Sequence, residues 1–123
     1  MDDSDTTVSE LKRISVRFAD DRDWRRYHSA KNLAIGVVTE ASELLQEFRF
    51  KSDEEIDGMF KSQGSRERIA DEVADTLYFI LQLSERYKLD LSTEFKRKMK
   101  KNAERYPVDK SRGSNRKYTE LEK

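Results

Sequence analysis

Residues 33–48 read LAIGVVTEASELLQEF, and their apolar members occupy most of the circumference of a helix. A helix with so little polar surface is expected to lie at the centre of the fold, and we predict that it runs from about Ala30 to about Arg49. Two acids, Glu40 and Glu43, interrupt the apolar residues of this segment. Polar groups in a buried setting are the informative exceptions in a sequence.

The rest of the chain also has helical rather than alternating periodicity, so the sequence predicts an all-α fold. We expect a four-helix-bundle-like subunit that oligomerises, with a polar C-terminal tail. The predicted helices run from about Val8 past Phe18 to the cluster at 20–23, from about 30 to 49 after Ser29 as N-cap, from Ser65 to about Tyr87, and from Ser92 or Thr93 to a stop before Pro107. The connection at 51–65 is predicted to contain a short helix.

A chain of 123 residues can bury one hydrophobic core, so we expect a single domain over residues 1–123. Its helical core is predicted at about 7–107, followed by a tail at 108–123 that is too charged to fold alone. Charged residues make up 41% of the chain and hydrophobic residues 35%, so little apolar surface is available for burial and self-association would help to close the core.

The charge balance limits the classes of partner. Lys plus Arg and Asp plus Glu number 25 each, so no whole-molecule field favours nucleic acid or an anionic membrane.

The absence of cysteine excludes disulfides, thiolate zinc sites and a cysteine nucleophile. No segment approaches a membrane span, and the acidic start, residues 1–5, lacks the features of a signal peptide. We therefore expect a cytoplasmic protein without a membrane or stable nucleic-acid partner.

A second acid pair, Glu72 and Asp75, repeats the spacing of Glu40 and Glu43 within another apolar helix. Residues at this spacing project from one helix face. Burial and mutual repulsion would raise the pKa values of four such carboxyls unless a divalent ion or basic side chains neutralise them. Oxygen ligands suit Mg²⁺ or Mn²⁺ better than zinc. Spacing alone leaves open the alternative of solvated or Arg- and Lys-paired acids, but the apolar surroundings favour a metal site.

The order of these motifs resembles the MazG-like all-α nucleoside triphosphate pyrophosphatases, and in particular their dCTP pyrophosphatase branch. The resemblance covers roughly residues 11–121. Besides the four acids, it is carried by Arg22-Asp23-Trp24, His28, Asn32-Leu33, FKSDEE at 50–55, KMKKN at 98–102, RYP at 105–107 and SNRKYTEL at 114–121.

The resemblance implies hydrolysis of a deoxynucleoside triphosphate, dCTP or a base-modified relative, to the monophosphate and pyrophosphate. Glu40, Glu43, Glu72 and Asp75 would hold Mg²⁺, with Mn²⁺ as a substitute, and Glu43 would accept the proton of the attacking water. Relatives form dimers or tetramers, so we expect a homo-oligomer, a tetramer in preference to a dimer, with each active site walled partly by a neighbouring chain.

Substrate contacts are expected at three places. Trp24 and Phe50 would form the sides of the base pocket, supported by His28 and Asn32. Phe79 would pack against the deoxyribose. Basic groups on the fourth helix would bind the phosphates, and the tail would close over them. The full predicted set is Trp24, His28, Asn32, Phe50, Phe79, Lys98, Lys101, Asn102, Arg105, Tyr106, Arg116, Lys117 and Tyr118.

Three departures from the family pattern leave the base preference open. Ser15 stands where the dCTP-selective relatives carry a histidine, Phe50 replaces a tryptophan and Phe79 replaces a tyrosine. A broad-range or dUTP-directed pyrophosphatase is therefore an alternative within the same fold. A non-enzymatic helical adaptor or nucleic-acid-binding module, using the basic face from Lys98 to Arg105, is the alternative outside it and would require no divalent ion.

Overall fold

The computed structural model describes residues 1–120, apart from the side chain of Tyr118, and all regular elements in this range are helical. The prediction of an all-α fold is confirmed. In chain order the elements are α1 (Val8–Asp21), the 3₁₀ turn η1 (Arg25–Tyr27), α2 (Ala30–Phe48), α3 (Asp53–Met59), α4 (Gln63–Arg86), α5 (Leu91–Arg105), α6 (Val108–Ser111) and the 3₁₀ turn η2 (Tyr118–Glu120). The chain divides into two compact units, Met1–Lys88 and a second unit that begins at Leu89.

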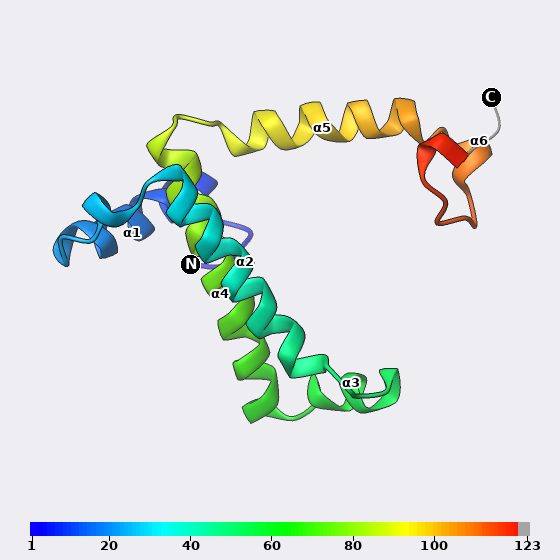
Figure 1. Ribbon diagram of the computed structural model, residues 1–123, viewed down its shortest axis with the longest axis horizontal. Helices are drawn as coiled ribbons and strands as arrows, with labels where there is room; N and C mark the ends of the chain where they lie inside the picture. The colour runs from blue at the N-terminus through cyan, green and yellow to red at the C-terminus, as the bar shows by residue number, and fades with distance from the viewer. Residues whose placement is uncertain (121–123) are drawn as a thin grey trace. The chain divides into compact units, whose positions relative to one another are not determined.

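The first unit is built on α2 and α4, which lie side by side and run in opposite directions (Figure 1). Leu33 of α2 and Ile69 and Leu81 of α4 are buried in this unit, and α1 packs against α4 with Ala19 fully buried. The prediction that residues 33–48 form the central helix is wrong for the single chain. The helix that packs against both α1 and α2 is α4, and within α2 only Leu33 is buried while much of its apolar circumference stays exposed. The antiparallel pairing also places the middle of α2 beside the middle of α4, where the two acid pairs lie.

The predicted limits of α2 are correct because its N-cap is a strong signal. The Ser29 hydroxyl accepts the backbone N–H of Asn32 at 3.2 Å, and α2 then runs to Phe48. The predicted short helix within 51–65 is also present as α3. A capping box holds its start, since Ser52 and Glu55 each accept the other's backbone N–H through their side chains.

Two predicted helix starts are wrong. Ser65 lies inside the first turn of α4, which begins directly after Ser62, and its hydroxyl donates to backbone carbonyls of the preceding residues. The start of α5 lies before Ser92 and Thr93, because the Asp90 carboxylate accepts the backbone N–H of Thr93 at 2.9 Å and caps the helix. Asp, Ser and Thr are all favourable caps, so a stretch that contains all three does not identify the capping residue from its sequence.

The second unit contains more structure than its composition indicates. As predicted, α5 ends before Pro107. The tail, however, is not wholly without structure: α6 forms directly after Pro107, whose carbonyl accepts the backbone N–H groups of Lys110 and Ser111, and η2 forms near the end of the described range. Pro107 is the N-cap residue of α6, and its missing N–H lies outside the hydrogen bonds of the helix. None of the helices described combines the length and the apolar character needed to cross a membrane.

Candidate metal centre and nucleotide site

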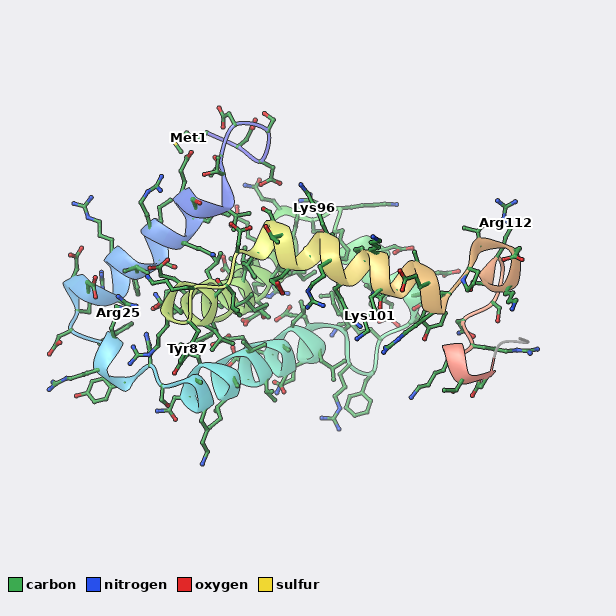
Figure 2. All side chains as sticks on the ribbon, turned by 90° about the horizontal axis from the view of Figure 1, so that it is seen from above. Met1, Arg25, Tyr87, Lys96, Lys101 and Arg112 are labelled. Atoms are coloured by element: carbon green, nitrogen blue, oxygen red, sulfur yellow. The ribbon has the colours of Figure 1, made fainter. Side chains whose placement is uncertain are left out.

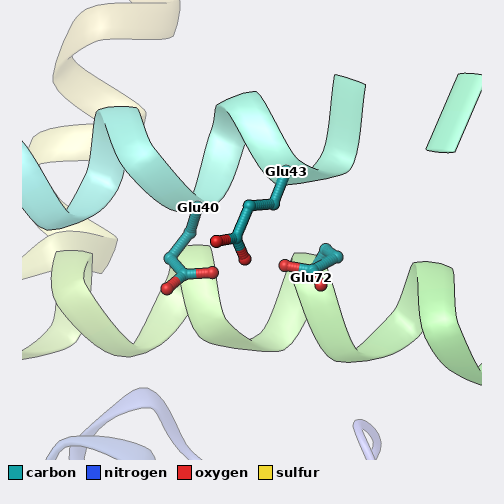
Figure 3. A group of neighbouring side chains, drawn as sticks. All are labelled: Glu40, Glu43 and Glu72. Carbon is teal, nitrogen blue, oxygen red and sulfur yellow. The ribbon is translucent and has the colours of Figure 1, made fainter. Parts of the chain in front are cut away.

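Three carboxylates converge between α2 and α4. Glu40 and Glu43 project from α2 and Glu72 from α4, and one oxygen of each lies within 4.8 Å of the other two (Figure 3). Glu40 and Glu72 are half-buried, and the Oε2 atom of each is inaccessible to solvent and accepts no hydrogen bond from any described residue. Such buried oxygens without donors are costly unless a cation or a proton satisfies them.

The electrostatics of the cluster require a counter-charge. Burial, followed by the hydrogen bond and the negative charge of Glu43, raises the pKa of Glu40 from 4.5 to about 7. Burial and the same neighbour also raise the pKa of Glu72. A divalent cation would supply the missing charge and would bind acceptor-only oxygens, which is the donor set that hard cations prefer. The residues present therefore fit a divalent metal ion.

Asp75, the fourth predicted acid, lies one turn after Glu72 on α4. Its charge contributes to the raised pKa of Glu40, so it lies close enough to act on the cluster. Its carboxylate is not among the three whose oxygens lie within 4.8 Å of one another. Asp75 is thus part of the electrostatic environment of the site, and its role as a ligand stays a prediction.

The metal-free protein is expected to lose stability as pH rises from 4.5 to about 7, the range across which the folded state binds an extra proton at Glu40. A group whose pKa is raised in the folded state stabilises that state below its unfolded pKa, and this contribution disappears as pH rises through the folded pKa. Melting temperatures measured in chelator for the wild type and for Glu40→Gln check this prediction. The difference between the two melting temperatures should shift steadily in favour of Glu40→Gln across this pH range. A difference that stays constant with pH would contradict the prediction.

Aromatic side chains from α1, from the two residues that flank η1 and from α4 form a second cluster in the same unit. Ring centroids lie 5.6 Å apart for Phe18 and Trp24, 5.9 Å for Phe18 and Tyr78, 5.1 Å for Tyr78 and Phe79, and 6.4 Å for His28 and Phe79. The predicted residues Trp24, His28 and Phe79 therefore belong to one cluster. Phe18 and Tyr78 link them. Sequence reasoning assigned Phe18 to the apolar face of the first helix and expected Tyr78, displaced by one position from the tyrosine of the family pattern, to point elsewhere. That expectation for Tyr78 is wrong, since its ring contacts both Phe18 and Phe79.

Phe79 rests directly against the backbone of α2. A Cβ atom added at Gly36 would lie only 2.5 Å from Cδ1 of the Phe79 ring, so the close approach of the two helices requires glycine there. We expect Gly36→Ala to displace the ring, to lower stability by about 1–3 kcal/mol and to raise the KM for nucleotide. Thermal melting and steady-state kinetics measure the two effects.

Gly58 within α3 offers a matched control, since an added Cβ there meets no atom within 4 Å. Gly58→Ala should leave KM unchanged and raise stability by about 0.5–1 kcal/mol. Equal behaviour of the two variants would show that the contact between Gly36 and Phe79 is unimportant.

Two other predicted base contacts have different surroundings. Phe50 lies shortly after α2 and has a left-handed backbone (φ 66°), a conformation that is energetically unfavourable for a non-glycine residue. It is 91% exposed, and the Arg49 guanidinium lies 4.5 Å from the centroid of its ring. An exposed aromatic ring held at such a residue is available for stacking. The Asn32 amide, by contrast, donates to the carbonyl of Tyr27 at 3.0 Å and so braces the turn before α2.

The predicted phosphate-binding residues lie in the second unit. Lys98, Lys101, Asn102 and Arg105 share one face of α5, and Figure 2 marks Lys101 together with Lys96 on this basic helix. Tyr106 is the C-cap of α5, and exposed Arg116 and Lys117 precede η2. The side chain of Tyr118 and the whole of Leu121 lie outside the described residues.

Comparison with known proteins identifies the family. Residues 35–121 match the model of the MazG-like family. The bovine dCTP pyrophosphatase 1 is 37% identical over 118 residues, which cover 96% of this chain and 70% of the relative. The human protein of the same name is 36% identical over 115 residues, covering 94% and 68%. The crystal structure of a pyrophosphatase from Archaeoglobus fulgidus superposes with a TM-score of 0.74 and 34% identity over 80% of this chain and 91% of that one. The chain belongs to the MazG-like family.

Proposed function

We propose that the protein hydrolyses dCTP, or a base-modified dCTP, to the monophosphate and pyrophosphate in a reaction that depends on Mg²⁺. The observation that carries this proposal is the convergence of Glu40, Glu43 and Glu72 within 4.8 Å, with buried oxygens that lack hydrogen bonds. The alignment of nearly the whole chain with relatives named dCTP pyrophosphatase 1 supports the choice of substrate.

In this reaction the four acids would hold the ion. When bound, Mg²⁺ would offset the charge of the phosphate oxygens and make a coordinated water a better nucleophile at neutral pH. Glu43 is the exposed member of the cluster, so its carboxylate is the best placed to accept the proton of that water. Lys98 and Asn102 would donate to the phosphates, while Trp24 and Phe50 would stack on the base.

A substrate panel tests the proposal. Pyrophosphate release is measured from dCTP, 5-methyl-dCTP, dUTP, dTTP, dATP, dGTP and CTP, each with Mg²⁺ and with chelator. Magnesium-dependent release that favours deoxycytidine nucleotides is the expected result. Release without a base preference would support only the broad-range enzyme, and release from none of the nucleotides would overturn the enzymatic function.

A homo-oligomer, tetrameric rather than dimeric, is the second part of the proposal. The first unit leaves large apolar side chains accessible on α2, among them Ile35 (53% exposed), Val38 (66%) and Leu45 (62%), and Val73 and Leu77 on α4 are also exposed. An apolar surface of this kind marks an interaction site. A second copy of the chain is the partner that would cover it, and each active site would then include residues of two chains.

Mixing two impaired variants tests shared sites directly. If one chain supplies the acids and another the basic helix, a mixture of Glu43→Gln and Lys98→Met subunits should recover activity, because some of its sites contain both wild-type residues. Sedimentation of the same samples gives the number of subunits. A mixture that exchanges subunits without any gain in activity would contradict shared sites.

A further inference from the structure

The side chain of Gln82 forms an unusual connection between α4 and α1. It is 1% exposed, and its Nε2 donates to the backbone carbonyl of Ser15 at 2.5 Å. Ser15 is itself buried, and its hydroxyl donates to the carbonyl of Lys12 within the same helix. The small side chain at this position leaves its carbonyl open to the amide from α4. A buried amide is tolerated only when it is hydrogen-bonded, so this contact fixes the place where the two helices meet.

The same region of α4 also binds the segment that follows α1. Gln82 also affects the pKa of His28 and of Tyr78, although burial is the main influence on each, and neither the Tyr78 hydroxyl nor Nδ1 of His28 forms a hydrogen bond with a described residue. One turn later, Nη1 of Arg86 donates to the carbonyl of Arg25 at 3.2 Å. Residues 15–28 are therefore attached to α4 near both ends, by Gln82 at Ser15 and by Arg86 at Arg25.

Trp24 lies within this attached segment. Its backbone N–H donates to the carbonyl of Ala19 at 2.9 Å, and its ring packs edge-on against Phe18. The indole is 45% exposed, so it is held in place by the segment rather than by burial. The position of the indole consequently depends on the contacts that hold residues 15–28 to α4.

The spacing along α4 connects this attachment to the acids. Asp75, Phe79, Gln82 and Arg86 recur at intervals of three or four residues and so share one face of the helix. Gln82 lies seven residues after Asp75, about 10 Å along the axis. The same helix therefore carries the acids Glu72 and Asp75 and, about 10 Å further along its axis, Gln82, which holds the segment that contains Trp24. A nucleotide can span this separation.

We propose that Gln82 is a positioning residue of the nucleotide site: it holds the segment carrying Trp24 at a fixed distance from the acids of α4, so that base and phosphates can bind together. This inference rests on the proposed function of the site. Gln82 itself does not touch the substrate, because its amide is buried and bound to Ser15. Its effect should therefore fall on nucleotide affinity rather than on the chemical step.

Ser84 provides a matched control two residues away on the same helix. It is equally buried, at 1% exposed, but its hydroxyl donates only to the carbonyl of Leu81 within α4. Gln82→Met keeps the length of the side chain and removes its hydrogen bonds, whereas Ser84→Ala removes a buried polar group that anchors no other element. A difference between the two variants thus reports the attachment and not the general loss of a buried hydrogen bond.

The first measurement requires no substrate. Trp24 is the single tryptophan of the chain, so its fluorescence reports this segment alone. In Gln82→Met we expect the acrylamide quenching constant to rise about twofold as the segment loosens, with no change in Ser84→Ala. Unchanged quenching in Gln82→Met would overturn the inference. If that variant does not fold, Arg86→Met removes the second attachment from an exposed position and should raise quenching in the same direction; no rise there would equally overturn it.

The second measurement separates positioning from catalysis. With dCTP and Mg²⁺, Gln82→Met should raise KM about tenfold and leave kcat within about twofold, while Ser84→Ala resembles the wild type. A fall in kcat at unchanged KM would overturn the inference. If the wild-type protein releases no pyrophosphate from dCTP, the proposed function fails, and the quenching comparison still decides whether Gln82 holds the segment.

Discussion

Replacing Glu43 by glutamine is expected to lower kcat for pyrophosphate release about a thousandfold, because the amide removes both a charged metal ligand and the proton acceptor proposed for the attacking water. The fold should be retained. Glu43 is exposed, and its charge raises the pKa values of Glu40 and Glu72, so removing it relieves repulsion in the metal-free protein. The melting temperature in chelator should therefore stay the same or rise while activity is lost.

Glu47 supplies the control for this variant. It lies one turn after Glu43 on α2, but its carboxylate pairs with the Arg68 guanidinium at 3.3 Å instead of joining the cluster. Glu47→Gln should keep activity within about twofold of the wild type, since a single ion pair to the exposed Arg68 contributes little. Calorimetric titration with Mn²⁺ completes the comparison: metal binding should weaken in Glu43→Gln and persist in Glu47→Gln. Full activity in Glu43→Gln would exclude the metal-site proposal.

The fold was largely predictable because its signals are local. The apolar circumference of residues 33–48 and the cap at Ser29 identify α2 from neighbouring residues alone, and the structure agrees. The starts of α4 and α5 were not predictable to the residue, since each lies in a stretch with several favourable caps. The short helix α6 depends on Pro107, which the sequence reading used only as a helix stop.

The candidate site was predictable where one spacing recurs on two helices. Recognising the acid pairs at 40/43 and 72/75 required only helical periodicity. The antiparallel packing of α2 and α4 then brings Glu40, Glu43 and Glu72 together. The anchor at Gln82 could not be predicted in this way. Its partner, Ser15, lies 67 residues away in the chain, and the contact is to a backbone carbonyl, which leaves no trace in the choice of residue at position 15 beyond small size.

Replacing Lys98 by methionine is expected to reduce kcat/KM for dCTP about a hundredfold, the cost of removing a charge-assisted hydrogen bond to a phosphate. Lys98 and Asn102 lie four residues apart on α5 and so present adjacent donors on one face. Methionine preserves the helix and the unbranched stem, so the change removes charge and donors only. Initial rates at low dCTP concentration, measured with saturating Mg²⁺, give kcat/KM directly.

Lys96 is the matched control, because it lies on the same helix (Figure 2) but two residues away, and its side chain therefore projects from a different face. Both lysines are exposed, so both variants remove the same charge from the same helix. A phosphate contact at Lys98 predicts a loss of kcat/KM in Lys98→Met alone. A diffuse attraction between a basic helix and an anionic substrate instead predicts losses of kcat/KM that are smaller, similar in both variants and strongly dependent on salt. Equal losses in the two variants would thus reassign α5 from a specific phosphate-binding face to general electrostatic steering, while leaving the metal centre as the source of the chemistry.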